Sequence, residues 1–132
     1  MRLWHQKLIP YLDRQRLLGQ HRECAALRGA GWGRKHSTVD YVFTHSPAYL
    51  VAYHYLIMDE MEKRGYHPDH IWDNWNYRGK NLGTQDDWII DEDRMKVIKL
   101  YNTHKIIYPE HNDEYLKECL NILHNKGIDI EL

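Results

Sequence analysis

Two neighbouring charged residues, Arg22 and Glu23, lie in the middle of a stretch that has helical periodicity. A helical side chain is closest to the residues three and four positions away, and around Arg22 and Glu23 those residues are glycine, alanine, leucine and glutamine. Neither charge therefore has an oppositely charged partner within its own helix. An unpaired carboxylate can stabilise positive charge or move a proton, and a salt bridge to a distant part of the chain is the structural alternative.

Gly19, three residues before Arg22, also indicates a functional site. Gly19 in a helix interior costs about 1 kcal/mol relative to alanine. That cost is easier to understand where another molecule approaches the backbone. We therefore interpret the surroundings of Arg22 and Glu23 as a candidate site.

Charge is distributed unevenly along the chain. Residues 1–50 hold eight Lys and Arg against three Asp and Glu, a balance of +5, whereas residues 51–132 hold ten against sixteen, a balance of −6. A basic half indicates an anionic partner, although such clustering also arises by chance. The chain has ten tyrosines and five tryptophans but one phenylalanine, so nearly all its aromatic rings carry a polar group. Such rings pack at the edge of a core or stack on nucleic-acid bases.

Ten histidines raise a competing hypothesis, a metal-dependent hydrolase. His67 and His70 are three residues apart but lie in an expected loop, and no H-E-x-x-H or cysteine-plus-histidine spacing occurs. Other histidines that could converge with carboxylates are His5, His21, His36, His45 and His54. We expect neither a metal nor a cofactor.

Several segments resemble a known family. They are RQRLLGQHRE at residues 14–23 with the following LRG, RKH at 34–36, HSP at 45–47 and YLKECLNILHNKGI at 115–128. These segments resemble the pyrimidine-dimer DNA glycosylases of the phage endonuclease V type. Over nearly its whole length the chain is also similar to bacterial proteins placed in that family by similarity. The resemblance implies a compact all-α fold and a DNA repair glycosylase with AP lyase activity.

The resemblance also implies a mechanism and a set of site residues. In the family the N-terminal α-amine is the nucleophile, the carboxylate matches Glu23, and the adjacent basic residue matches Arg22. Arg2 is too bulky for ordinary removal of the initiator methionine, so we expect the amine of Met1 to attack, with a reference pKa near 7.7–8.0. The expected DNA-binding residues are Arg2, Arg16, His21, Trp32, Arg34, Lys35 and His36.

The expected substrate is double-stranded DNA that is abasic or carries pyrimidine-dimer-like damage. The aromatic C-terminal tail of characterised members is missing, since residues 81–132 are acidic. The segment WDNWNYRGK at 72–80 either replaces that tail or is a packed surface loop. A nucleic-acid-binding module without catalysis is the alternative to the enzyme.

Helix start and stop signals predict the elements that must position these residues. Helices are expected over 13–28, from 46 to 63 or 64, over 91–103, and from 112 or 113 to 125, with an extended piece at 39–43 and a long loop at 67–85. The prediction is an all-α, mostly helical bundle of about four helices with long irregular loops, in a single domain over 1–132.

Composition narrows the class of protein further. With 42% hydrophobic residues and a mean hydropathy of −0.76, the chain is globular, and no run approaches the roughly 18 apolar residues of a membrane span. Cys24 and Cys119 are too few for a disulfide scaffold, and the N-terminus lacks the features of a signal peptide. We expect a cytoplasmic protein that begins at Met1, with no membrane partner.

Overall fold

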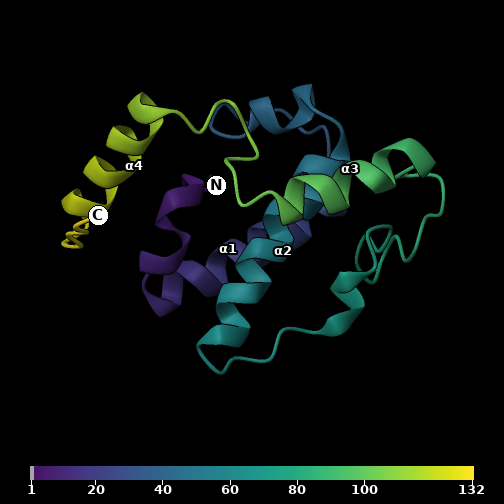
Figure 1. The fold of residues 1–132 in the computed structure, drawn as a ribbon, viewed down its shortest axis with the longest axis horizontal. Helices are drawn as coiled ribbons and strands as arrows, with labels where there is room; N and C mark the ends of the chain where they lie inside the picture. The colour runs from purple at the N-terminus through teal and green to yellow at the C-terminus, as the bar shows by residue number, and fades with distance from the viewer. Residues whose placement is uncertain (1) are drawn as a thin grey trace.

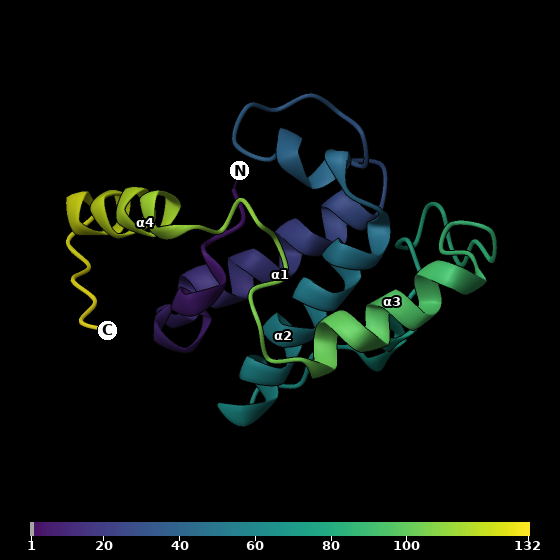
Figure 2. The same cartoon turned by 45° about the horizontal axis from the view of Figure 1, so that its top comes forward.

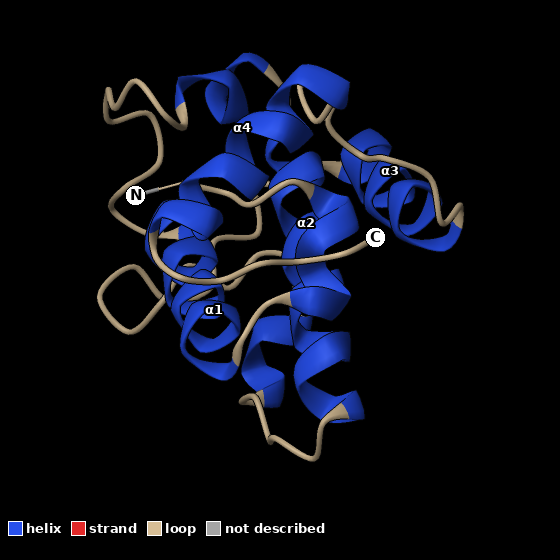
Figure 3. Cartoon of the chain, turned by 90° about the vertical axis from the view of Figure 1, so that its left-hand side faces the viewer, coloured by secondary structure: helices blue, strands red, loops and turns tan. Residues whose placement is uncertain are grey.

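The computed structural model describes residues 2–132, and side-chain caps begin two of the α-helices in that range. The four α-helices are α1 (Arg14–Arg28), α2 (Pro47–Lys63), α3 (Asp91–Asn102) and α4 (Asp113–Asn125). Three 3-10 helices join them, η1 (Gln6–Tyr11), η2 (Asp40–Thr44) and η3 (His70–Asp73). No strand occurs in this part of the chain, as Figure 3 shows, so the all-α prediction is confirmed.

Each predicted helix is found within one residue of its expected ends. The Ser46 hydroxyl accepts from the Ala48 N–H at the start of α2, and the Asn112 side chain accepts from the Tyr115 N–H at the start of α4. Asp13 makes no such cap and binds Arg16 instead, at 3.2 Å. After α1 the chain turns so tightly that a Cβ on Gly31 would lie 2.7 Å from the Ala26 carbonyl oxygen, so only glycine fits there.

Helix α2 is the centre of the core. It packs against α1 on one side and α3 on another, which Figures 1 and 2 show from two directions. Its buried residues lie all round the helix, since they are Ala48, Leu50, Val51, Ala52, Tyr53, His54, Ile57, Met58 and Met61. Helix α4 lies beside the first described residues of the chain, since Tyr115 donates to the Leu3 carbonyl, and Cys119 and Leu123 belong to the same buried cluster as Leu3.

The extended piece expected at 39–43 is wrong. The chain forms the 3-10 helix η2 there, and the Val42 N–H donates to the Val39 carbonyl at 2.9 Å. Val39 and Val42 are the buried residues, which is a period of three and not the alternation of a strand. With no neighbouring strand among residues 2–132, the backbone groups find local partners instead.

The loop predicted over 67–85 contains η3 and a single antiparallel bridge between Tyr77 and Thr84. Arg78 donates from Nε to the Arg28 carbonyl at 2.7 Å and from Nη2 to the Gly29 carbonyl at 3.2 Å, which closes the end of α1. The Trp72 ring packs on Tyr77 and under the Arg28 guanidinium. The packed-loop interpretation of 72–80 is the one these contacts favour. None of the helices between residues 2 and 132 is long and apolar enough to cross a membrane.

Candidate active site: a basic groove beside Glu23

The side chains of Arg22 and Glu23 line a groove with a volume of about 360 Å³. We call it the Glu23 groove. Its walls are one face of α1, the N-terminal segment and the end of α4, with lining residues Arg2, Trp4, Gln15, Arg16, Gly19, Gln20, Arg22, Glu23, Ile122 and Lys126. Four of these residues are cationic and Glu23 is the one carboxylate. The groove therefore suits an anionic ligand and places one acidic group within it.

Glu23 is half-buried and has no ion-pair partner among residues 2–132. Its Oε2 atom is buried and has no hydrogen-bond partner among residues 2–132, and no ion pair in that range involves Arg22 or Glu23. The salt bridge considered as the structural alternative is therefore not found in the described chain. Burial raises the pKa of the Glu23 carboxyl, and the positive form of His36 opposes that rise. A carboxyl with a raised pKa is suited to proton transfer.

Three of the four cations in the groove differ in how firmly they are held. Arg16 pairs with Asp13, and Arg2 lies 3.9 Å from the Glu118 carboxylate, with its guanidinium near the Trp4 ring. Arg22 is exposed, and its Nη2 atom lies 3.6 Å from where a Cβ on Gly19 would stand. Gly19 thus leaves open space beside a guanidinium that has no ion-pair partner in the described chain, as the sequence suggested.

Lys126 forms the far wall of the groove. It is the exposed C-cap residue of α4, one turn after Ile122. It lies in the half of the chain whose charge balance is negative, so charge counting gave no reason to single it out. The KG pair after α4 was the only local signal, because a basic residue before glycine marks a helix end.

The predicted binding residues outside α1 are spread over a wider surface. Arg34, Lys35 and His36 are exposed in the loop after α1 but do not line the groove. Trp32 is partly buried between Phe43 and Trp88, with ring centroids 5.0 and 5.7 Å away. The structure thus brings together Arg2, Arg16, Arg22 and Glu23 in the lining of the groove, and Arg34, Lys35 and His36 are not part of that lining. Met1 lies outside the described residues.

His21 faces the interior more than the groove. Its Nδ1 atom is 2.7 Å from His54 Nε2, and His54 Nδ1 is 3.0 Å from Nη1 of the fully buried Arg28. Burial, together with the charges of Arg28 and Arg22, lowers the pKa of His21. Burial also lowers the pKa of Arg28, to about 10. These contacts give His21 a packing role, and a DNA contact by His21 stays a prediction.

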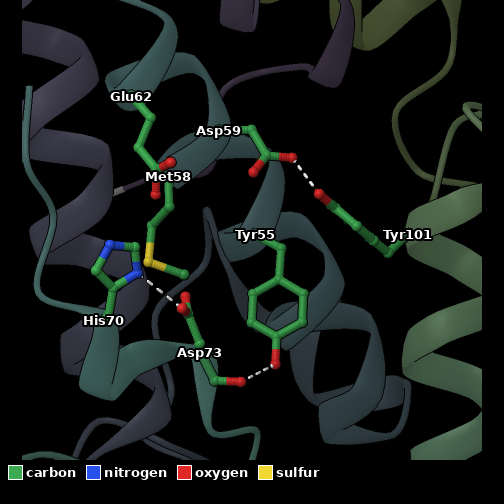
Figure 4. Close-up of a pocket in the computed structure, with 7 residues that line it drawn as sticks. All are labelled: Tyr55, Met58, Asp59, Glu62, His70, Asp73 and Tyr101. Atoms are coloured by element: carbon green, nitrogen blue, oxygen red, sulfur yellow. Dashed lines mark hydrogen bonds and ion pairs between the residues drawn. The ribbon is translucent and has the colours of Figure 1, made fainter. Parts of the chain in front are cut away.

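A second pocket of about 360 Å³ lies between α2, η3 and α3, and Figure 4 shows its lining. We call it the Asp59 pocket. Asp59, Glu62 and Asp73 line it without any lysine or arginine, and the remaining lining residues are Tyr55, Met58, His70 and Tyr101. The Tyr101 hydroxyl donates to Asp59, which raises the pKa of Tyr101 to about 12, and Asp73 accepts from His70 at 2.8 Å. This pocket has the wrong charge for DNA.

The histidines do not assemble a metal site within residues 2–132. No three His, Cys, Asp or Glu side chains in that range are placed to hold a metal ion. Nothing in the described residues therefore supports the hydrolase hypothesis.

Comparison with known proteins gives one match. A family model for pyrimidine dimer DNA glycosylases matches residues 1–74, which is more than half of the chain. The chain belongs to the pyrimidine dimer DNA glycosylase family. No curated protein and no solved structure matches it. The resemblance stated from the sequence is thereby confirmed, and membership supports a DNA repair glycosylase whose substrate is DNA.

The glycosylase family match covers one side of the groove only. Residues 1–74 include α1 and α2 and therefore Glu23 and three of the four cations, whereas Ile122 and Lys126 lie beyond the match. Two buried residues inside the matched range, Gln20 and Tyr53, also contact the N-terminal segment, which the sequence did not predict. Gln20 lies three residues before Glu23 and therefore on the same helix face. That position was the one feature of the sequence that could have indicated a role for Gln20 near the site.

Proposed function

We propose that this protein is a DNA glycosylase and AP lyase that acts on double-stranded DNA containing abasic sites or pyrimidine-dimer-like damage, through an imine with the α-amine of Met1. The observation that carries the proposal is the half-buried Glu23 carboxylate, which has no partner among residues 2–132 and lies in a cation-lined groove with the N-terminal segment as one wall. Family membership supports the DNA repair glycosylase, and the groove supports the finer mechanism.

The chemistry uses one amine and one carboxylate. The neutral α-amine attacks C1′ of the deoxyribose, the bond from C1′ to the base breaks, and loss of the amine proton with ring opening gives the imine. At an abasic site the same amine condenses with the C1′ aldehyde and water leaves. Glu23 stabilises the positive charge that develops at the sugar. It then accepts the C2′ proton, and elimination expels the 3′ phosphate and cuts the strand.

The cations have a separate task. In this proposal Arg2, Arg16, Arg22 and Lys126, which line the groove, contact phosphates around the reacting sugar, and the exposed Arg34, Lys35 and His36 contact phosphates further along the duplex. Such contacts position DNA without reading its sequence. The volume of the groove, about 360 Å³, is in the range of small-ligand sites, roughly 300–1,000 Å³. In this proposal the groove admits one unstacked nucleotide.

Borohydride trapping tests the proposal. With an abasic duplex, reduction is expected to give a covalent protein–DNA adduct, and peptide mapping is expected to place it on residue 1. One glycine added before Met1 moves the amine by about 3.5 Å and should suppress trapping far more than binding. One glycine added after the exposed Leu132 is the matched control and should change neither.

Two other outcomes would revise the mechanism. An adduct on Lys126, whose amine is in the same groove, would mean a lyase with a different nucleophile. Binding without any adduct, on abasic and on dimer-containing DNA, would favour the noncatalytic binding module.

A further inference from the structure

Residues 2–4 have no regular secondary structure, yet side chains from three helices hold their backbone. The Gln20 side chain of α1 accepts from the Trp4 N–H at 2.6 Å and donates to the Arg2 carbonyl at 2.9 Å. Tyr53 of α2 donates to the Trp4 carbonyl at 2.6 Å, and Tyr115 of α4 donates to the Leu3 carbonyl at 2.5 Å. We call Gln20, Tyr53 and Tyr115 the N-terminal clamp.

Gln20 and Tyr53 of the clamp are buried, and Tyr115 is half-buried. Gln20 is 2% exposed, and Tyr53 and Leu3 are fully buried. The amide of Gln20 meets one donor and one acceptor of the backbone, which fixes both its own orientation and the direction of the chain beside it. The Tyr53 hydroxyl also lies 2.9 Å from Gln20 Oε1, so one tyrosine supports the glutamine and the backbone that it holds.

The clamp and the candidate catalytic carboxylate share one helix face. Gln20 and Glu23 are three residues apart on α1, and both line the groove. The Arg2 carbonyl that Gln20 binds therefore has a fixed position relative to Glu23, since a helix turn is rigid. Met1 is bonded directly to Arg2, and consecutive Cα atoms are about 3.8 Å apart.

We infer that Gln20 and Tyr53 are positioning residues, which hold the N-terminal segment so that the α-amine of Met1 is presented to the sugar beside Glu23. This inference rests on the proposed function. Both act through the backbone of residues 2–4, to which the Gln20 amide and the Tyr53 hydroxyl are hydrogen-bonded. A clamp that serves stability alone would lower the folded fraction and leave the rate per folded molecule unchanged.

The experiment compares Tyr53→Phe and Gln20→Met with Tyr108→Phe. Tyr108 is a fully buried tyrosine whose hydroxyl has no partner among residues 2–132, so its replacement removes the same atom without breaking a hydrogen bond. We expect the two clamp variants to slow single-turnover imine trapping about 10- to 100-fold, as small misplacements of a reacting group do. Their Kd for abasic DNA should stay within about threefold of wild type, because the phosphate contacts are intact. Tyr108→Phe should change neither quantity.

A second measurement excludes a general loss of structure. The glycine added before Met1 should reduce trapping strongly in the wild-type protein and much less in Tyr53→Phe, because the two changes disturb the same distance. If circular dichroism shows that one of the clamp variants is unfolded, Tyr115→Phe takes its place. It removes the third clamp hydroxyl at a half-buried position.

The outcomes separate the two proposals. No adduct from the wild-type protein overturns the proposed function itself. A wild-type adduct, with clamp variants that are folded and trap at the wild-type rate, overturns the positioning role alone. A decrease in trapping matched by an equal decrease in DNA affinity, or additive effects of Tyr53→Phe and the added glycine, overturns it as well.

Discussion

The Glu23 groove and the Asp59 pocket have the same volume, about 360 Å³, and opposite electrostatics. In the pocket, Asp59 and Asp73 are exposed and accept hydrogen bonds from Tyr101 and His70. In the groove, a single half-buried carboxylate has no partner among residues 2–132 and is surrounded by cations. The volume of a pocket therefore does not identify a functional site in this protein. The partners of the carboxylates that line the pocket distinguish the two regions.

The largest expected difference between the two regions is catalytic. Glu23→Gln keeps the shape of the side chain but cannot accept a proton, so single-turnover cleavage of abasic DNA should fall by about 10²–10⁴-fold. Glu62→Gln in the Asp59 pocket is the matched control and should cleave at the wild-type rate. A Glu23→Gln protein that cleaves normally would remove Glu23 from the mechanism and erase the contrast.

The second difference concerns DNA affinity. Replacing Arg34 and Lys35 together by alanine should weaken binding and lower the slope of log K against log salt by roughly 0.9 for each phosphate that the variant no longer neutralises. Lys99→Ala, on the exposed side of α3, removes one charge from the acidic half and should leave the slope unchanged. An unchanged slope in the double variant would show that the loop after α1 does not contact DNA.

A third prediction concerns pH. Burial raises the pKa of Glu23. As the pH is lowered, cleavage should therefore begin to decline at a higher pH than it would with an ordinary glutamate. The folded protein binds the Glu23 proton more tightly than the unfolded chain does. Ionised Glu23 therefore lowers the free energy of unfolding above its raised pKa. Below the ordinary glutamate pKa the group is protonated in both states and has no such effect. Glu23→Gln should therefore be more stable than wild type at neutral pH, by under about 1 kcal/mol because solvent screens the half-buried group.

Thermal unfolding of wild type and Glu23→Gln across pH measures that effect. The stability difference should vanish in acid, and Glu62→Gln should show no such pH-dependent gain. A lower stability of Glu23→Gln at neutral pH would instead mean that the carboxylate has a stabilising partner.

The smallest expected effect is at Gly19. A Cβ there would meet Arg22 Nη2 at 3.6 Å, an ordinary contact, so Gly19→Ala should gain about 0.5–1 kcal/mol of helix stability. The added methyl group projects into the groove, so cleavage should slow by a few-fold. Chemical denaturation and single-turnover kinetics measure the two effects, and a variant that is both more stable and fully active would show that the substrate does not approach Gly19.

The parts of the molecule that local chemistry determines were predictable. Ser46 with Pro47 and Asn112 begin helices through contacts within three residues, and Gly29 ends one, so these boundaries could be read from the sequence. The piece at 39–43 could not, because a strand requires a partner elsewhere in the chain and none is found between residues 2 and 132.

The same distinction applies to the site. The lack of a helical partner for Glu23 follows from counting three and four positions along α1, and it is confirmed for the described residues. The contact of Tyr53 with Gln20 spans 33 residues, and Lys126 reaches the groove from the far end of the chain. No periodicity encodes such contacts. The contacts of Trp32 with Phe43 and Trp88 are also between distant residues, and a DNA contact by Trp32 stays a prediction.

The hydrogen bond from Tyr115 to Leu3 also bears on how the protein is made. It joins residues 112 positions apart, and the Gln6 N–H likewise donates to His111, so the beginning of the chain completes these contacts only once the segment around the start of α4 is made. At synthesis rates of roughly 5–20 residues per second, Leu3 waits about 6–20 s for Tyr115 to be made. The wall that holds Ile122 and Lys126 follows later still. A nascent chain on the ribosome therefore lacks a finished groove until Ile122 and Lys126 have been made.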